Sequence, residues 1–167
     1  MQFRKLEKSE SLLYRELRLE SLRLDPDAYT TTFKDANAMA KLFFEKVIED
    51  EESARFAMGA FDRELLIGHF CFAYDQPFGL TNTGSLVQMY VKPEFRGRGI
   101  GQKLAQAIIG KALAISGVEA LLLEVKANNP SAIAVYEKVG FETFDVYPIP
   151  MDSSLGTPLI RMRWKNA

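Results

Sequence analysis

RGRGIG, at residues 96–101, joins two segments of different character. Residues 86–91 before it form a short apolar run typical of a strand, and residues 102–116 after it carry the apolar spacing of a helix. Glycines let main-chain N–H groups approach an anion closely, and the first turn of a helix adds unpaired donors and the positive end of its dipole. The turn therefore predicts a pyrophosphate site. Its residues are Arg96, Gly97, Arg98, Gly99, Ile100 and Gly101.

The glycine spacing differs from that of two other phosphate loops. Counted from Gly97 or Gly99, the third glycine of the dinucleotide pattern G-x-G-x-x-G falls on Gln102 or Leu104. The nucleoside-triphosphate pattern fails as well, because the Gly-Lys pair at residues 110–111 lacks both the earlier glycine and the hydroxyl residue that should follow. What remains is R-x-x-G-x-G after a strand.

The two arginines of the turn would add charge and forked donors to the phosphate site. A plainer interpretation makes Arg96 and Arg98 solvated loop charges, and Gly99 and Gly101 ordinary turn residues. Three glycines within five positions are an unnecessary entropic cost for an ordinary turn, which favours the phosphate site.

A second informative block covers residues 123–141 and reads LEVKANNPSAIAVYEKVGF. Together with the turn, in this order and over residues 86–141, it resembles the acyl-CoA signature of the GNAT family of N-acetyltransferases. The positions of the second block that match the family pattern are Asn129, Ala132, Tyr136, Lys138, Gly140 and Phe141.

The resemblance implies an α/β fold in a single domain, with a mixed, mainly antiparallel sheet flanked by helices. It further implies that the central strands at residues 86–91 and 120–125 splay apart. Acetyl-CoA would be the co-substrate, with no metal, and its pantetheine arm would lie in the cleft against backbone groups of Met89, Tyr90 and Val91.

Composition sets limits on the class of protein. The 167 residues suit one domain, 1–167, and 47% of them are hydrophobic, enough for a sizeable core. The net charge of −1 gives no basic field for nucleic acid, and no apolar run is long enough for a membrane span. A single cysteine and an N-terminus without an apolar signal segment favour a cytoplasmic enzyme or binding module.

Periodicity and turn residues predict the remaining elements. Strands are expected at residues 2–6, 54–61, 65–74, 86–91, 120–125, 141–147 and 159–164. Helices are expected at residues 9–24, 35–50, 102–116 and 130–139, with loops at 76–84 and 148–158. The first helix should bury Leu13, Leu17 and Leu24, and the second Met39, Leu42, Phe43 and Val47.

Tyr136 and Asn129 are the site candidates of the second block. A thiol with a pKa of about 8.5 leaves a thioester more readily when a phenol donates a proton, and the resemblance places that phenol at Tyr136. The alternative is a core tyrosine with its hydroxyl bonded. Asn129 precedes Pro130 and suits a helix N-cap, while the resemblance places it near the CoA arm. One side chain can serve both roles.

The general base is weakly specified. An alkyl amine with a pKa of about 10 must lose a proton before it attacks. Some members of the family use a carboxylate on the strand before the phosphate turn, but residues 85–90 contain no acid. Glu124 is the nearest candidate for the base. Alternatively, Glu124 is only a satisfied polar residue on a buried strand, and a chain of water molecules relays the proton. A main-chain N–H near Met89 should polarise the carbonyl oxygen.

His69 and Cys71 offer a rival chemistry. They are the only histidine and cysteine, and they lie two apart on a predicted strand, hence on one face. An imidazole-activated thiolate nucleophile is conceivable there. However, Phe70 and Phe72 flank the cysteine, and a lone cysteine in an apolar strand usually belongs to the core.

The sequence therefore predicts an acetyl-CoA-dependent N-acetyltransferase that moves an acetyl group to a primary amine by direct attack in a ternary complex. The alternative is a non-catalytic acyl-CoA sensor. A small amine, a peptide N-terminus and a lysine all stay open as acceptors, as does a homodimer. Residues that could line the acceptor site are Arg18, Tyr29, Phe33, Tyr74, Phe78 and Tyr147.

Overall fold

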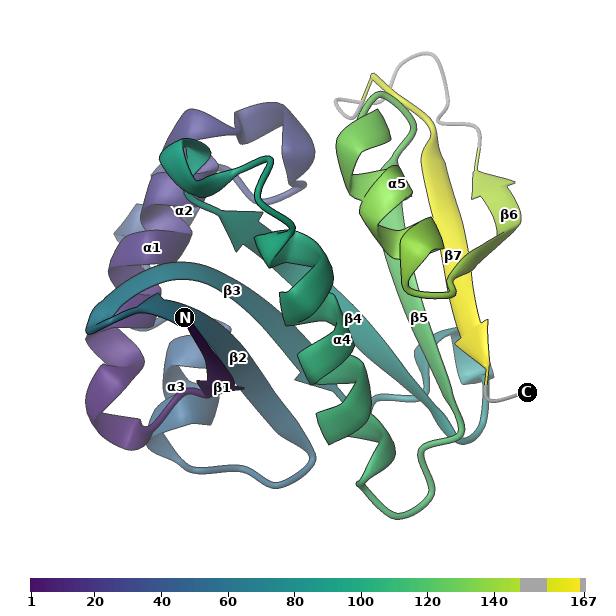
Figure 1. Ribbon diagram of the computed structural model, residues 1–167, viewed down its shortest axis with the longest axis horizontal. Coiled ribbons are helices and arrows are strands. Elements are labelled where there is room, and N and C mark those ends of the chain that lie inside the picture. Colours follow the sequence, from purple (N-terminus) through teal and green to yellow (C-terminus); the bar gives the residue numbers. More distant parts are fainter. Residues whose placement is uncertain (148–155, 166–167) are drawn as a thin grey trace.

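The computed structural model describes residues 1–147 and 156–165, and these form one seven-stranded sheet with helices on both faces (Figure 1). The strands are β1 (Gln2–Lys5), β2 (Arg55–Asp62), β3 (Leu65–Ala73), β4 (Thr83–Val91), β5 (Ala120–Lys126), β6 (Glu142–Tyr147) and β7 (Leu159–Lys165). The helices are α1 (Ser11–Leu24), α2 (Phe33–Ala38), α3 (Phe43–Glu49), α4 (Ile100–Leu113) and α5 (Pro130–Lys138).

The strand order in the sheet is β1-β2-β3-β4-β5-β7-β6. Every neighbouring pair is antiparallel except β4 and β5, which run parallel. The predicted fold class, a mixed and mainly antiparallel sheet flanked by helices, is therefore confirmed. The helix α4 connects the two parallel strands, as a parallel pair requires a long crossover.

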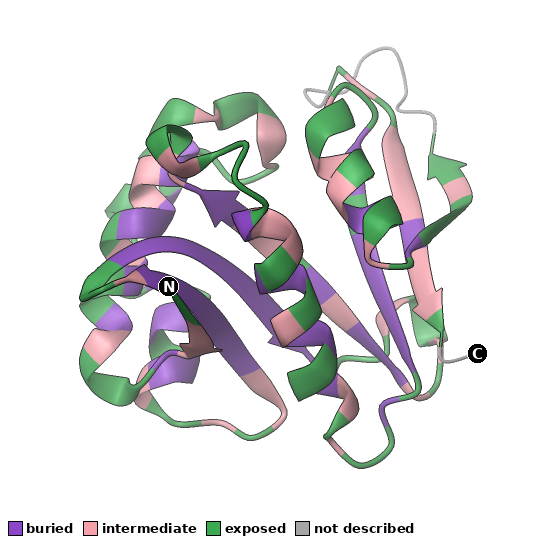
Figure 2. Ribbon diagram, in the orientation of Figure 1, coloured by how far each residue is buried: buried purple, intermediate pink, exposed green. Residues whose placement is uncertain are grey.

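Successive residues of β2 and β3 point to opposite faces of the sheet, and both faces are covered. On one face Phe56, Phe70 and Phe72 pack with α4 in a core cluster. On the other, Phe61 and Cys71 pack with α1 and α3 in a second cluster. Figure 2 shows the result, since β2 and β3 are buried over most of their length. The strands β2 and β3 therefore form the buried part of the sheet next to β4.

The predicted apolar stripe of α1 is wrong. Leu17 is buried, but Leu13 and Leu24 are 40% and 50% exposed. The buried face instead follows Tyr14, Leu17, Arg18, Ser21 and Leu22, a stripe rotated by about one residue. The shift arises because Tyr14 hydrogen-bonds Gln88 from inside the core, with 2.6 Å between oxygens, so a polar residue occupies a core position.

The helix predicted at residues 35–50 is two short helices, α2 and α3, with a break between them. At the break the Arg15 guanidinium donates to the carbonyl oxygen of Met39 at 2.8 Å, and Glu45 accepts from the main-chain N–H of Leu42 at 2.9 Å. These bonds satisfy the ends that the break exposes. Met39 and Phe43, which were expected inside, are exposed, whereas Leu42 and Val47 are buried.

The other elements match their predicted ranges to within a few residues. The helix α4 begins at Ile100 and ends at Leu113, slightly earlier than expected. Within the loop predicted at 148–158, residues 148–155 lie outside the described residues. None of the helices in the described part of the chain is long and apolar enough to cross a bilayer.

Candidate active site

The glycine-rich turn forms an open cradle at the start of α4. Gly97 and Gly99 adopt left-handed φ angles of 74° and 73°, a region that side-chain-bearing residues avoid. A Cβ at either position would point into open space. Gly99 is the N-cap of α4 and has no side chain to cap it, so the main-chain N–H groups of the first turn remain available to an anion.

The two arginines of the turn take different positions. Arg96 lines the main cavity, where its Nε donates to the carbonyl oxygen of Val91 at 2.8 Å and its guanidinium pairs with Asp25. Arg98 is exposed, donates to the carbonyl oxygen of Glu94 at 3.0 Å, and is not among the residues that line the cavity. Arg96 therefore links the end of β4 to the residue that follows α1, and it also supplies positive charge to the cavity.

The strands β4 and β5 separate beside this turn. They pair only where residues 83–85 face residues 120–122, so the rest of β4 has no partner on that edge. On its other edge the pairing with β3 shifts between His69 and Cys71, and Gln88 has a left-handed φ of 64°. This bulge leaves Gln88 and Met89 outside the ladder. The predicted splay is confirmed, and unpaired main-chain groups face the gap.

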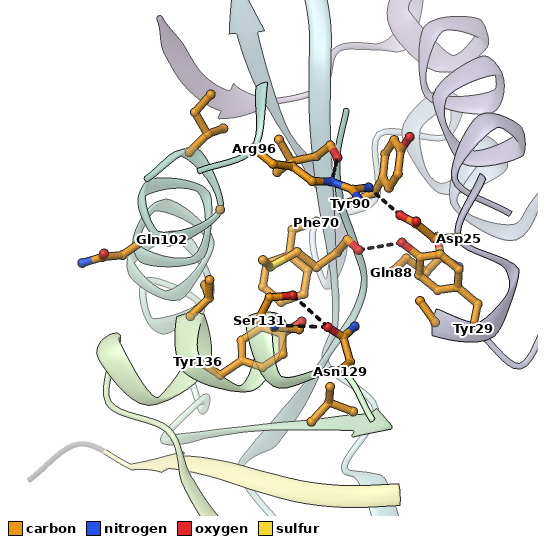
Figure 3. A pocket seen from close by; sticks show the side chains of 18 of the residues that line it. Asp25, Tyr29, Phe70, Gln88, Tyr90, Arg96, Gln102, Asn129, Ser131 and Tyr136 are labelled. Atoms are coloured by element: carbon orange, nitrogen blue, oxygen red, sulfur yellow. Dashed lines mark hydrogen bonds and ion pairs between the residues drawn. The ribbon is translucent and has the colours of Figure 1, made fainter. Parts of the chain in front are cut away.

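A cavity of about 790 Å³ occupies the gap and continues to the N-terminus of α4 (Figure 3). Of the catalytic and CoA-binding residues that the sequence selected, all but Arg98 line this cavity. Those that line it are Met89, Tyr90, Val91, Arg96, Gly97, Gly99, Ile100, Gly101, Glu124, Asn129 and Tyr136.

Tyr136 projects from α5 into this cavity, as Figure 3 shows. Its ring packs between Phe70 and Phe141, with centroid distances of 6.1 and 6.0 Å. Burial raises the pKa of the phenol above its usual 10. The group therefore stays protonated at neutral pH and can act as a hydrogen-bond donor.

Asn129 is the N-cap of α5. Its side-chain oxygen accepts from the main-chain N–H of Ala132 at 3.2 Å and from the Ser131 hydroxyl at 3.1 Å. The capping role is thus observed, and Pro130 follows at the first helical position. Asn129 also lines the cavity, so both interpretations of this residue are compatible with the structure.

Glu124 is the one exposed residue of β5, which is otherwise buried. Its carboxylate accepts from Arg161 Nε on β7 at 2.7 Å. The plainer interpretation of Glu124 as a satisfied polar residue agrees with this ion pair, but the side chain is exposed, because the pairing of β4 with β5 stops at Leu122. Glu124 instead stands where β4 and β5 part.

A second cavity, of about 450 Å³, adjoins the first. The two share a strip of residues on β4, on β5 and after α1. These are Ala28, Tyr29, Leu86, Val87, Gln88 and Glu124.

The acceptor residues suggested by the sequence divide between this second cavity and other places. Arg18, Tyr29 and Phe78 line the second cavity. Phe33 packs on the core, and the Tyr74 hydroxyl bonds the carbonyl oxygen of Gly117 at 3.0 Å. The other of the six, Tyr147, lies under the Arg161 guanidinium at 3.8 Å from the ring centroid. None of these last three lines either cavity.

His69 and Cys71 are buried in the sheet and line neither cavity. Burial lowers the pKa of the imidazole to about 3 and raises that of the Cys71 thiol. Because the thiol is neutral and inaccessible, the structure argues against a thiolate nucleophile.

Several cavity residues were not anticipated from the sequence. Gln88 and Asp25 reach the site through a bulge and a helix end, and a strand pattern gives no signal for either. Gln102 and Ser131 lie in the first turns of α4 and α5. Gln102 and Ser131 could have been predicted from the sequence as site residues, because each lies next to a residue of a recognised motif.

Comparison with known proteins bears on the same region. Residues 13–141 match the model of the acetyltransferase (GNAT) family. The chain is 44% identical over 57 residues to the ribosomal protein bS18-alanine N-acetyltransferase of Salmonella typhimurium, covering 34% of this chain and 38% of that protein. It is 31% identical over 86 residues to N-alpha-acetyltransferase 30 of Schizosaccharomyces pombe, covering 52% and 57%. It thus spans less than two thirds of either relative.

A solved structure from Salmonella typhimurium, determined with its cofactor acetyl-CoA, superposes with a TM-score of 0.74. The superposition covers 99% of this chain and 93% of that one at 16% identity. At this identity the likeness shows a shared fold.

Proposed function

The chain belongs to the acetyltransferase (GNAT) family, and from that premise we propose that it transfers an acetyl group from acetyl-CoA to a primary amine. The proposal rests on one observation. Two cavities share lining residues where β4 and β5 stop pairing. The first cavity reaches the glycine-rich N-terminus of α4, which no side chain caps. The second cavity extends from the shared residues of β4 and β5 toward α1. A donor in the first and an acceptor in the second would meet at Glu124.

The cradle at α4 fits a diphosphate. The left-handed glycines keep Cβ atoms away from the first-turn N–H groups, and the helix dipole favours negative charge there. Arg96 adds positive charge at the wall of the cavity. We assign Arg98 at most a screening role, because its side chain lies outside the cavity.

The unpaired edge of β4 fits an amide-containing arm. Main-chain groups of residues 86–89 have no β5 partner, and they can bond the amides of a pantetheine chain as a strand would. Asn129 lies across the gap at the N-cap of α5, and its amide NH₂ bonds none of the described residues while its oxygen caps the helix. The arm would therefore run from the α4 cradle toward Glu124.

When bound, acetyl-CoA supplies a thioester whose carbonyl carbon forms a bond to the acceptor nitrogen as the carbon–sulfur bond breaks. In this proposal a main-chain N–H near Met89, which the bulge leaves outside the pairing with β3, polarises the carbonyl oxygen. Tyr136 donates a hydrogen bond to the departing thiolate. Because its pKa is raised above 10 and that of a thiol is about 8.5, the phenol stabilises the thiolate mainly by hydrogen bonding.

In this proposal Glu124 accepts the proton that the amine loses. Its carboxylate lies at the strip where both cavities meet, and the bond from Arg161 holds it in position. The proton passes from nitrogen to this carboxylate directly or through one water, a step of general base catalysis.

A screen for acetyl-CoA consumption tests the function against the alternative of a non-catalytic sensor. Wild-type protein is incubated with acetyl-CoA and a panel of small amines, amino acids and peptides, and released thiol is measured. We expect at least one amine to be acetylated, with the product verified by mass spectrometry. Tight acetyl-CoA binding without acetylation of any amine in the panel would favour the sensor.

A further inference from the structure

Two buried cations border the second cavity. Arg18 on α1 is 5% exposed and Lys126 at the end of β5 is 8% exposed, and both line the cavity. A buried charge is costly unless an opposite charge or strong hydrogen bonds compensate it. The ion pairs found among the described residues include neither side chain.

The contacts that these cations do make are long or uncharged. Arg18 Nη1 lies 3.4 Å from the Ser21 hydroxyl, and its guanidinium carbon lies 4.4 Å from the centre of the Tyr29 ring. Lys126 Nζ lies 3.4 Å from the carbonyl oxygen of Tyr29. Tyr29 thus contacts both cations, and neither cation has a carboxylate partner among the described residues.

The buried titratable groups described near Arg18 are neutral. The nearby imidazole of His69 is neutral, because burial and then the Arg18 charge depress its pKa to about 3. Burial also keeps the Cys71 thiol and the Tyr14 phenol protonated by raising the pKa of each. Of the two acids that line the cavity, Glu124 is paired with Arg161 and Asp75 accepts from the Ser85 hydroxyl at 2.8 Å.

We propose that the acceptor amine carries a carboxylate, and that Arg18 and Lys126 bind this carboxylate in the second cavity. The proposal rests on the proposed acetyl transfer and adds the class of acceptor. Lys126 and Glu124 lie two residues apart on one face of β5, about 6.6 Å along the strand. A compact molecule with an amine and a carboxylate can therefore reach both, its carboxylate at the cations and its nitrogen at Glu124.

This chemistry has two sources, a free amino acid and the N-terminus of a peptide whose second residue is acidic. Polyamines are disfavoured, because their additional positive charges would enter a cavity lined by two buried cations that form no ion pair with any described residue. The charges of Arg18 and Lys126 also predict that amino-acid amides are poor acceptors, because these amides have the shape of the amino acids but lack the carboxylate.

The first test compares matched acceptors on the wild-type protein. Each free amino acid is paired with its primary amide, and each peptide with aspartate or glutamate in second place is paired with its asparagine or glutamine counterpart. Spermidine completes the panel. We expect kcat/KM to be about 10- to 100-fold higher for the carboxylate member of the preferred pair, as for a charge-assisted hydrogen bond. Equal or higher rates with the amides would overturn the proposal.

The second test removes each cation. Arg18→Met and Lys126→Met should each raise KM for the carboxylate acceptor about 10-fold or more and leave its amide counterpart little changed. Arg18→Lys should keep part of the preference. Arg23→Met is the matched control, an exposed arginine on the same helix that lines neither cavity, and it should behave as wild type. An unchanged preference in Lys126→Met and Arg18→Met would contradict the assignment.

The two proposals fail in different ways. If amines are acetylated without regard to a carboxylate, the acceptor class is wrong and the acetyltransferase activity stands. If the wild type acetylates no member of the panel, the activity itself is wrong and the acceptor class falls with it. Should Arg18→Met not fold, the wild-type pairs and Lys126→Met still decide the matter.

Discussion

The Tyr29 hydroxyl donates a hydrogen bond to the main-chain carbonyl oxygen of Met89, with 2.8 Å between the two oxygens. Tyr29 follows the short turn after α1, and Met89 lies at the bulge of β4, so this bond joins the N-terminal helices to the strand that lines both cavities. Burial raises the pKa of Tyr29 to about 12, which keeps the phenol protonated as a donor. Figure 3 shows Tyr29 facing the strand.

Tyr29→Phe removes this bond and leaves a carbonyl oxygen without its partner. We expect the free energy of unfolding to fall by roughly 1 kcal/mol and KM for the amine to rise. Urea titration and steady-state kinetics measure the two effects. Tyr74→Phe is a matched control, because it breaks a tyrosine-to-carbonyl bond away from both cavities. If the two variants had the same KM, the bond would have no role in the site.

Tyr136→Phe keeps the packing against Phe70 and Phe141 and removes only the donor. We expect kcat to fall by about ten- to a thousand-fold, while the affinity for acetyl-CoA measured by calorimetry stays unchanged. Since the pKa of Tyr136 is raised above 10, kcat should show no loss from its ionisation between pH 6 and pH 9. Unchanged turnover would remove Tyr136 from the mechanism.

Glu124→Gln removes the proposed proton acceptor. We expect kcat to fall by about 100-fold or more at neutral pH, and to recover in part as the pH approaches the amine pKa of about 10. Arg161→Met is the comparison, because it removes the ion-pair partner that positions Glu124 and keeps the carboxylate itself, so its loss of kcat should be smaller. If Arg161→Met were as impaired as Glu124→Gln, the carboxylate would matter only through the pair.

Gly99→Val puts a branched side chain into the open mouth of the cavity, where a diphosphate would lie, at a φ of 73° that such a residue avoids. We expect acetyl-CoA affinity to fall below detection by calorimetry in a folded protein. The control is Gly79→Val, which suffers similar strain because Gly79 has a φ of 72°, and which lines neither cavity. Undiminished affinity in the Gly99 variant, or an equal loss in both variants, would contradict the diphosphate site.

His69 should make stability depend on pH. Its folded-state pKa of about 3 is below its ordinary value of 6.5, so the unfolded chain binds more protons between these values. The contribution is complete above pH 6.5 and is lost as pH falls toward 3, by about 1.4 kcal/mol per pH unit. His69→Phe should flatten this slope between pH 6 and pH 4 in urea titrations. The same slope in the variant would assign the dependence to other groups.

The sequence predicted the parts of the site that depend on local geometry. The turn at residues 96–101 and the Asn129-Pro130 helix start each fix their conformation within a few residues, through glycines and a cap. The positions of the strands along the chain followed from alternation and turn residues, and the splay followed from the resemblance.

The features that sequence reasoning missed depend on contacts between distant segments. The left-handed Gln88 follows from no local pattern, and its side chain accepts from Tyr14, 74 residues earlier. Arg96 pairs with Asp25 across 71 residues, which its place in a glycine-rich turn does not reveal. The stripe predicted for α1 omits Tyr14 and Arg18, which are buried, and includes Leu13 and Leu24, which are exposed.

A crystal structure of the protein with CoA tests the proposed site most directly. We predict diphosphate oxygens within about 3.2 Å of main-chain nitrogens in the first turn of α4, with the arm running along residues 86–89 toward Glu124. A nucleotide bound elsewhere, or a glycine turn filled by side chains of the protein itself, would contradict the site and the transfer built on it.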